Sequence, residues 1–176
     1  MRAIVVLTML LIAQGAAPAF AAAAQCTGFK WDITQELALW HGPSTMLAAG
    51  SATATAPNIA ANRLYELHLV PQSAVTFALS PGRSSTPDGA YAGLATLHLD
   101  SPGRYRIAVD TPLWIDVVGN GQLATVTDFQ GQQNCDGPHK IVEFDLTGAR
   151  QFVVQLSGSA SAIVRLSATM SPARTF

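Results

Sequence analysis

From Leu64 onward, hydrophobic and polar residues alternate along the chain with a period of two. Tyr65, Leu67 and Leu69, for example, alternate with Glu66 and His68. This alternation is typical of β-strands that bury one face. It predicts strands at 65–69, 75–79, 94–99, 104–109, 113–118, 141–146, 152–156 and 162–168, with one more short strand between 119 and 135.

Short turns rich in glycine, proline and serine separate these strands, and no helical pattern falls between them. Strands joined in this way favour antiparallel pairing in two packed layers. The pattern therefore predicts an all-β fold, an antiparallel β-sandwich or jelly roll of about eight strands with one short N-terminal helix.

Two parts of the chain, 65–80 and 142–157, resemble one another without a gap. Each part reads as a strand, a turn and a second strand. The match indicates either two related hairpins, one in each half of the sandwich, or coincidence between amphipathic hairpins.

The segment before the strands has a helical period. Asp32–Gln35 has the spacing of a capping box, and Ile33, Leu37 and Trp40 follow on one helical face. These residues predict a short helix from Ile33 to Trp40. We expect Trp31 and Trp40 to bury against one end of the sandwich, so that the helix caps the core.

The first 24 residues have the layout of a secretory signal peptide: an early arginine, an apolar run from Ala3 to Ala13, and small residues before Gln25. The apolar run is too short to remain in a bilayer as an anchor. We expect a periplasmic or secreted protein with no transmembrane anchor after cleavage. The predicted parts are the signal peptide (1–24), an N-terminal helix and edge segment packed on the sandwich (25–63), and the β-sandwich domain (64–176).

The chain contains two cysteines, Cys26 and Cys135. An even pair in an exported protein predicts a disulfide. Closing a loop of about 110 residues would stabilise the fold by about 4–5 kcal/mol in the chain-entropy model.

Charged residues make up 12% of the chain, and the formal net charge is −1. An average soluble domain has about 25% charged residues. No cluster of lysine and arginine is present that would hold a nucleic acid, so nucleic acid is not an expected partner.

The polar segment around Cys135 is the strongest candidate for a ligand site. Its amide side chains offer paired donors and acceptors to sugar hydroxyls or to a peptide backbone, and a disulfide would reduce its ordering cost on binding. The candidate ligand-binding residues are Phe129, Gln130, Gln132, Gln133, Asn134 and His139, with Trp114 as an aromatic platform. The alternative interpretation is that the amides satisfy the backbone of the loop and that the tryptophans belong to the core.

No nucleophile elbow and no phosphate-binding glycine loop occurs in the sequence. Glu66, His68 and His98 would form a facial triad for iron or another divalent metal if their strands paired in register. Otherwise they are three separate surface residues. We expect no catalytic residues, no metal and no cofactor, and keep the triad as an alternative.

The segment 101–109, Ser-Pro-Gly-Arg-Tyr-Arg-Ile-Ala-Val, resembles the turn-G-x-Y-x-I-x-V signature of bacterial pre-peptidase C-terminal (PPC-like) domains. The resemblance extends roughly over 64–170. Domains of this family are secreted β-sandwich modules that are generally non-catalytic and attached to enzymes. The resemblance therefore implies a binding or accessory role.

The segment 26–32, Cys-Thr-Gly-Phe-Lys-Trp-Asp, together with 128–135 and 138–144, resembles a group of small exported proteobacterial proteins of unsettled function. Some members of that group carry the label homogentisate 1,2-dioxygenase. Enzymes of that name bind Fe(II) through two histidines and a carboxylate in a jelly roll. No histidine motif of theirs matches this chain.

The sequence thus favours a non-catalytic exported β-sandwich module that binds a carbohydrate or a protein partner in the cell envelope. Two alternatives remain open: a metal-dependent dioxygenase on a jelly roll, and a purely structural envelope protein.

Overall fold

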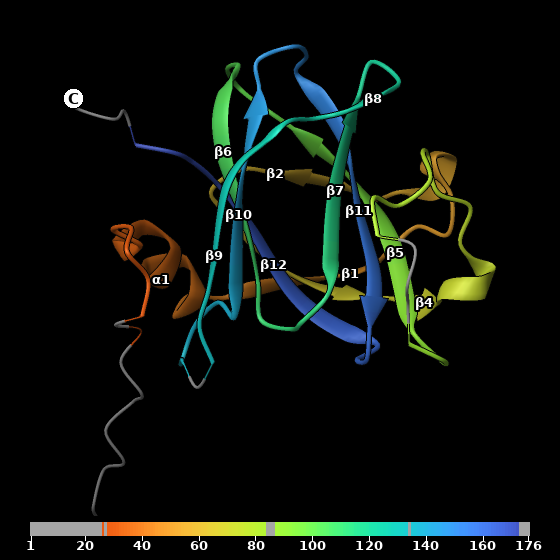
Figure 1. Cartoon of the computed structure of the whole chain (residues 1–176), viewed down its shortest axis with the longest axis horizontal. Coiled ribbons are helices and arrows are strands. Elements are labelled where there is room, and N and C mark those ends of the chain that lie inside the picture. The colour runs from red at the N-terminus through yellow and green to blue at the C-terminus, as the bar shows by residue number, and fades with distance from the viewer. Residues whose placement is uncertain (1–25, 27, 84–86, 134, 173–176) are drawn as a thin grey trace, which may run out of the picture.

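The computed structural model describes residues 26, 28–83, 87–133 and 135–172. Within these ranges the chain forms twelve strands in two packed sheets and one α-helix (Figure 1). The predicted all-β sandwich is confirmed. The predicted signal peptide, 1–24, lies outside the described residues. Where the structure describes the chain, it contains no helix of the length and hydropathy needed to cross a membrane.

Each sheet has strands from both ends of the chain. The first sheet consists, in spatial order, of β1 (Ser44–Ala48), β3 (Leu64–His68), β12 (Ile163–Met170), β6 (Gly103–Val109), β10 (Lys140–Leu146) and β9 (Val126–Gly131). The second consists of β2 (Asn58–Ala60), β5 (Tyr91–His98), β11 (Gln151–Ser159), β7 (Trp114–Gly119) and β8 (Gln122–Leu123), with β4 (Val70–Pro71) beside β5. The chain also forms two short 3₁₀ helices in the described residues, η1 (Thr53–Thr55) and η2 (Gln72–Ala74).

Most neighbouring strands are antiparallel, but β1 runs parallel to β3 and β2 runs parallel to β5. Both exceptions lie at a sheet edge. They come from the segment 25–63, which therefore supplies one edge strand to each sheet. The sheets are mixed, which corrects the expectation of purely antiparallel pairing and of about eight strands.

The period-two pattern places alternate side chains of both sheets in one shared core, as expected for stacked sheets. The largest fully buried side chains of this core are Phe144, Ile59, Leu67, Leu97, Ile107, Leu146, Leu156 and Leu166. The six long strands predicted between 94 and 168 agree with β5, β6, β7, β10, β11 and β12 to within a few residues.

Residues 75–79 do not form the strand that their alternation predicts. Instead, the segment after η2 crosses the outer face of the second sheet. There the Gln155 amide accepts a hydrogen bond from the Leu79 N–H and donates one to the Leu79 carbonyl, both at 3.1 Å. Asp116 accepts from the Gly82 N–H at 3.0 Å. These buried side chains supply the partners that a neighbouring strand would otherwise provide.

The duplicated hairpin is also not present. The second copy would need β10 and β11 to pair, but these strands lie in different sheets. The first copy lacks its second strand. The structure therefore does not contain the two related hairpins that one interpretation of the similarity requires.

The N-terminal segment covers the outer face of the first sheet (Figure 1). Cys26 is joined by a disulfide to Cys135, which lies between β9 and β10, so the predicted bond is present. Helix α1 (Thr34–Trp40) packs against β12. The apolar contacts form a cluster separate from the main core: Phe29, Ile33, Trp40, Leu64, Ala108 and Ile141. The helix thus covers a sheet face instead of capping one end of the sandwich, which corrects that expectation.

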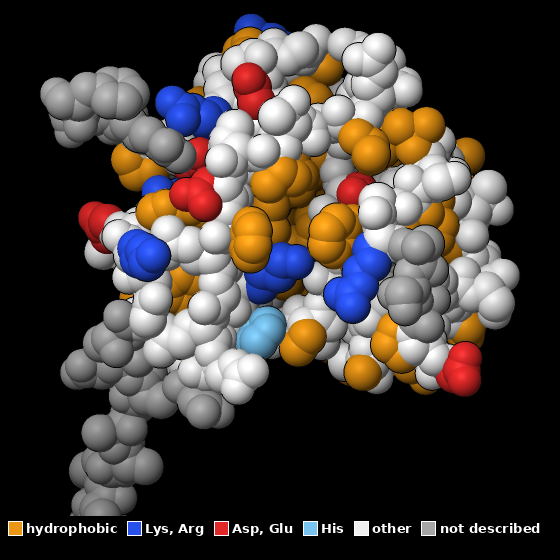
Figure 2. All heavy atoms as spheres, in the orientation of Figure 1, with side chains coloured by type: hydrophobic (Ala, Val, Ile, Leu, Met, Phe, Trp, Pro, Cys, Tyr) orange, Lys and Arg blue, Asp and Glu red, His pale blue; other side chains and the backbone are white. Residues whose placement is uncertain are grey.

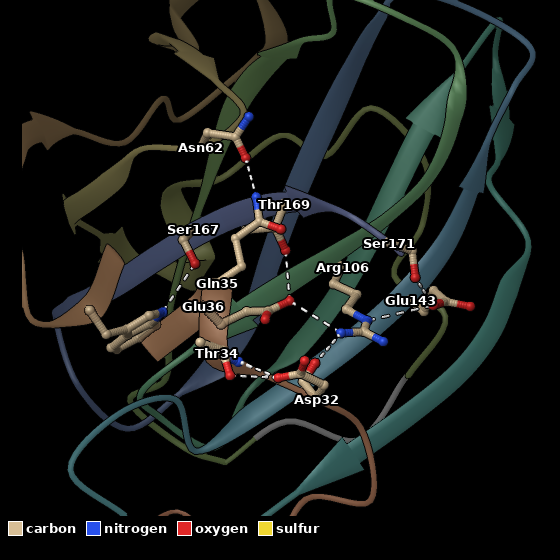
Figure 3. A network of polar contacts seen from close by, with 11 residues as sticks. Asp32, Thr34, Gln35, Glu36, Asn62, Arg106, Glu143, Ser167, Thr169 and Ser171 are labelled. Carbon is tan, nitrogen blue, oxygen red and sulfur yellow. Dashed lines mark hydrogen bonds and ion pairs between the residues drawn. The ribbon is translucent and has the colours of Figure 1, made fainter. Parts of the chain in front are cut away.

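Asp32 lies two residues before Thr34, the first residue of the helix, and Ile33 occupies the N-cap position. The Asp32 carboxylate accepts hydrogen bonds from the Thr34 hydroxyl at 2.6 Å and from the Thr34 N–H at 2.9 Å. These hydrogen bonds lower the pKa of Asp32 below its ordinary value. Gln35 does not complete the capping box, because its amide donates to Asn62 Oδ1 at 2.8 Å (Figure 3).

Arg106 lies under the N-terminal segment between two buried carboxylates, Glu36 and Glu143 (Figure 3). Its Nη1 is 3.5 Å from Glu36 Oε1, and its Nε is 3.6 Å from Glu143 Oε2. The guanidinium lies 4.5 Å from the centre of the Trp31 ring and donates to the Asp32 carbonyl at 2.8 Å. Hydroxyl groups that donate to the two carboxylates belong to Thr127, Thr169 and Ser171. The network ties the N-terminal segment to β6, β10 and β12.

Reduction of the Cys26–Cys135 disulfide is expected to destabilise the protein by about 4–5 kcal/mol, because the unfolded chain regains the entropy of the open loop. Urea unfolding with and without dithiothreitol measures the change, and the double variant Cys26→Ser, Cys135→Ser provides a second form without the bond. An unchanged unfolding midpoint in both would contradict the prediction.

Replacing Arg106 by Met is expected to destabilise the fold by about 3–5 kcal/mol, because the buried carboxylates of Glu36 and Glu143 would both lose their ion pair with Arg106. The matched control is Arg104→Met. This residue lies on the same strand, is 41% exposed and is 3.9 Å from Glu143. It is expected to cost less than about 1 kcal/mol. Chemical denaturation measures the free energy of unfolding of both variants. Equal losses of stability in Arg106→Met and Arg104→Met would show that burial of the Arg106 ion pairs is unimportant.

Candidate functional site

At one edge of the sandwich, β9 ends the first sheet and β7 with the short β8 ends the second. Figure 2 shows hydrophobic side chains in a hollow on this side of the molecule, with positively charged side chains beside them. We call this hollow the open-edge groove. Its apolar part, of about 160 Å³, is lined by Trp114, Ile115, Val126, Phe129, Lys140 and Val142. Its cationic part, of about 390 Å³, includes Arg83, Leu113, Trp114, His139, Lys140 and Ser157.

Strand β9 brings two hydrophobic side chains to this groove. Phe129 pairs in register with Val142, so both side chains lie on the inner face of the sheet. A register shift next to Thr127 then places Val126, and not Thr127, opposite the core residue Phe144. Such a bulge moves the side chain on its far side, here that of Val126, to the opposite face of the sheet. As a result Val126 and Phe129 both face the groove, 49% and 66% exposed.

Lys140, the first residue of β10, contributes a half-buried positive charge. Its ammonium donates to the Leu113 carbonyl at 3.1 Å and lies 5.3 Å from the centre of the Trp114 ring. Burial lowers the pKa of Lys140 and the charge of Arg83 lowers it further, while Asp116 acts in the opposite direction. Among the ion pairs of the described residues, none includes Lys140 or Arg83.

Asp116 positions the aromatic wall of the groove. Its carboxylate, 8% exposed, accepts hydrogen bonds from the Trp114 indole N–H and from the Gly82 backbone N–H, each at 3.0 Å. Because Arg83 follows Gly82 directly, the same carboxylate helps to place this arginine at the groove. Asp116 thus accepts hydrogen bonds from two neutral donors of the protein, and its negative charge also favours the protonated form of Lys140.

The structure brings three of the predicted ligand-binding residues together. Phe129, His139 and Trp114 all line the open-edge groove. Gln133 is exposed beyond the end of β9. Asn134 lies outside the described residues.

Gln130 and Gln132 do not lie in the groove. The Gln130 side-chain oxygen accepts from the Lys30 N–H at 2.6 Å, and that of Gln132 accepts from the Gly28 N–H at 2.7 Å. Gln130 belongs to a strand and pairs with Ile141, which faces the N-terminal segment. The two amides therefore hold that segment in place, whereas the alternative interpretation of the sequence had them satisfy the backbone of their own loop. We do not include them in the site.

The candidate metal triad is not assembled. Glu66 and His68 lie on β3, with His68 Nε2 3.1 Å from Glu66 Oε1. His98 lies on β5 of the other sheet and contacts Asn58 Oδ1 at 2.8 Å. Strands β3 and β5 belong to different sheets and cannot pair as the triad requires. No group of three or more His, Cys, Asp or Glu side chains among the described residues is arranged to hold a metal ion.

Comparison with known proteins adds no relative from which a role could be transferred. No protein-family model matches the chain, and no curated protein matches it significantly. The groove is therefore interpreted from its own residues.

Replacing Lys140 by Met is expected to leave the melting temperature unchanged or slightly higher, because Met keeps the apolar stem and removes a charge that burial disfavours. In the wild type, the folded state gives up the Lys140 proton at a lower pH than the unfolded chain does. Wild-type stability relative to the variant should therefore rise as the pH is raised from neutral toward the ordinary lysine pKa of 10.5.

Thermal unfolding of the two proteins across this pH range measures the difference. Lys30→Met, at an exposed position of the N-terminal segment, serves as the matched control and is expected to show no such trend. A clear loss of stability in Lys140→Met at neutral pH would instead assign Lys140 a structural role.

Proposed function

We propose that this protein is a non-catalytic binding module that acts after export to the cell envelope and takes its ligand in the open-edge groove. The observation that carries the proposal is the exposure of Phe129 and Val126 beside Trp114. Exposed hydrophobic side chains that line a hollow on the surface of a folded protein are typical of ligand sites.

Two features would keep the groove in one shape before a ligand arrives. Its walls belong to paired strands, and Gln130 and Gln132 attach β9 to the N-terminal segment. The Cys26–Cys135 disulfide holds the same region of the chain. A preformed site loses less conformational entropy on binding.

The ligand classes suggested by the sequence are a carbohydrate and a segment of a partner protein. Phe129 and Trp114 offer aromatic surface, on which a sugar ring or an apolar side chain would pack. An extended peptide would add to β9, which ends its sheet. The resemblance to PPC-like modules supports a non-catalytic role, and the disulfide supports export, because such bonds persist outside the cytoplasm.

Replacing Phe129 by Ser is expected to weaken ligand binding at least about ten-fold, because an aromatic side chain at the centre of a site contributes more than about 1.4 kcal/mol. Arrays of glycans, peptides and lipids, probed with wild type and variant, provide the measurement. Met46→Ser is the control, since Met46 is 67% exposed on β1 at the opposite edge of the same sheet.

Equal binding by wild type and Phe129→Ser would exclude the groove as the site. If the wild type binds to none of the three arrays, the binding role fails and the purely structural alternative is favoured. No observation on the structure favours the dioxygenase alternative, since its metal ligands are not brought together.

A further inference from the structure

The open-edge groove has two chemically different parts that share Trp114 and Lys140. In the apolar part, Ile115, Val126 and Val142 present hydrocarbon with no hydrogen-bonding group. In the cationic part, Arg83 and the Lys140 ammonium lie next to this hydrocarbon surface. The apolar and the positively charged part of the groove therefore adjoin at these two shared residues.

No carboxylate among the described residues forms a direct ion pair with the cations of the groove, although the negative charge of Asp116 acts on Lys140. Lys140 donates to a neutral carbonyl, that of Leu113, and in the described part of the chain neither Lys140 nor Arg83 takes part in an ion pair. Asp116 is already bonded to Trp114 and to a backbone N–H. An incoming anion would thus gain charge-assisted hydrogen bonds that the empty groove lacks.

On the basis of the proposed function, we propose that the groove binds an anionic amphiphile: a carboxylate or similar oxyanion head at Lys140 and Arg83, with an apolar body against Phe129 and Val126. The two halves of such a molecule match the two parts of the groove in order. Burial of the apolar body would release water from hydrocarbon surface, and the head would form the charged contacts.

A neutral sugar fits this arrangement less well. Its hydroxyl groups would lose their hydrogen bonds to water in the apolar part, where Ile115, Val126 and Val142 offer none in return. A neutral peptide strand on β9 would use the backbone edge but would leave the cations without a partner. Charge complementarity therefore favours the amphiphile over both.

The test uses three small probes with the full mature protein: octanoate, which has both parts, 1-octanol, which lacks the charge, and acetate, which lacks the apolar body. Isothermal titration calorimetry at neutral pH gives the affinities. Octanoate is expected to bind at least roughly ten-fold more tightly than 1-octanol or acetate. A hydrogen bond to a charged group contributes about 1.5–3 kcal/mol of binding free energy, which corresponds to a ten-fold or larger change in affinity.

Variants then separate the two parts of the groove. Lys140→Met and Arg83→Gln are expected to reduce octanoate affinity roughly ten-fold each while leaving octanol unchanged. Phe129→Ser is expected to weaken both ligands. Met46→Ser, at the opposite edge of the first sheet, is expected to change neither, and circular dichroism verifies that every variant is folded.

Each remaining outcome overturns the inference in a distinguishable way. Equal binding of octanoate and octanol would remove the anionic head from the proposal. Absence of octanoate binding, together with a glycan or neutral peptide whose binding depends on Phe129, would overturn the amphiphile and keep the proposed binding role. If no probe, glycan, peptide or lipid depends on Phe129, both proposals are wrong.

Discussion

Both sheets carry polar side chains on outer faces that water does not reach, and the architecture depends on supplying partners for them. Arg106 and Glu143 are buried on the first sheet, and Gln155 and Asp116 on the second. A buried polar group without a partner is costly, by several kcal/mol for a charge. The N-terminal segment with α1 supplies partners on one side, and the segment after η2 supplies them on the other. With both faces covered in this way, the groove between the sheet edges remains open.

Two cations of the molecule illustrate how this arrangement separates structure from function. Arg106 has a carboxylate on each side and the Trp31 ring against it, so its charge is paired inside the protein. Lys140 also lies against a tryptophan, but its hydrogen-bond acceptor is a carbonyl. Removal of the first charge should disrupt the fold, whereas removal of the second should disrupt recognition. The difference lies in the neighbouring carboxylates and not in the type of residue.

The strands were predictable where the pattern of buried positions is regular. Between 94 and 118 and between 141 and 168, alternation reports directly on a half-buried sheet, and the structure agrees. The alternation in 75–79 is equally regular but reflects a segment lying on a sheet face, held by Gln155. The parallel pairing of β1 with β3 and of β2 with β5 cannot be seen in the periodicity of the sequence, because the pairing of distant strands depends on tertiary packing.

The site was predicted in part, for an identifiable reason. Composition pointed to 128–139, but the first part of this stretch belongs to strand β9. Alternate side chains of a strand lie on opposite faces of the sheet, so Phe129 and Gln130 point in opposite directions. The bulge beside Thr127 hid Val126, since it breaks the period on which a sequence prediction relies. Arg83 and Lys140 meet across elements far apart in the chain, and no local pattern relates them.

Each of the three tryptophans of the chain lies beside a cation: Trp31 by Arg106, Trp40 by Arg165, and Trp114 by Lys140. Trp31 and Trp40 belong to the N-terminal segment, so their fluorescence depends on how that segment packs on the sheet. Trp114 lies in the wall of the groove. The intrinsic emission of the protein therefore contains two spatially separate optical signals. A change confined to Trp114 would follow occupancy of the groove, while Trp31 and Trp40 would follow release of the segment, without any added dye.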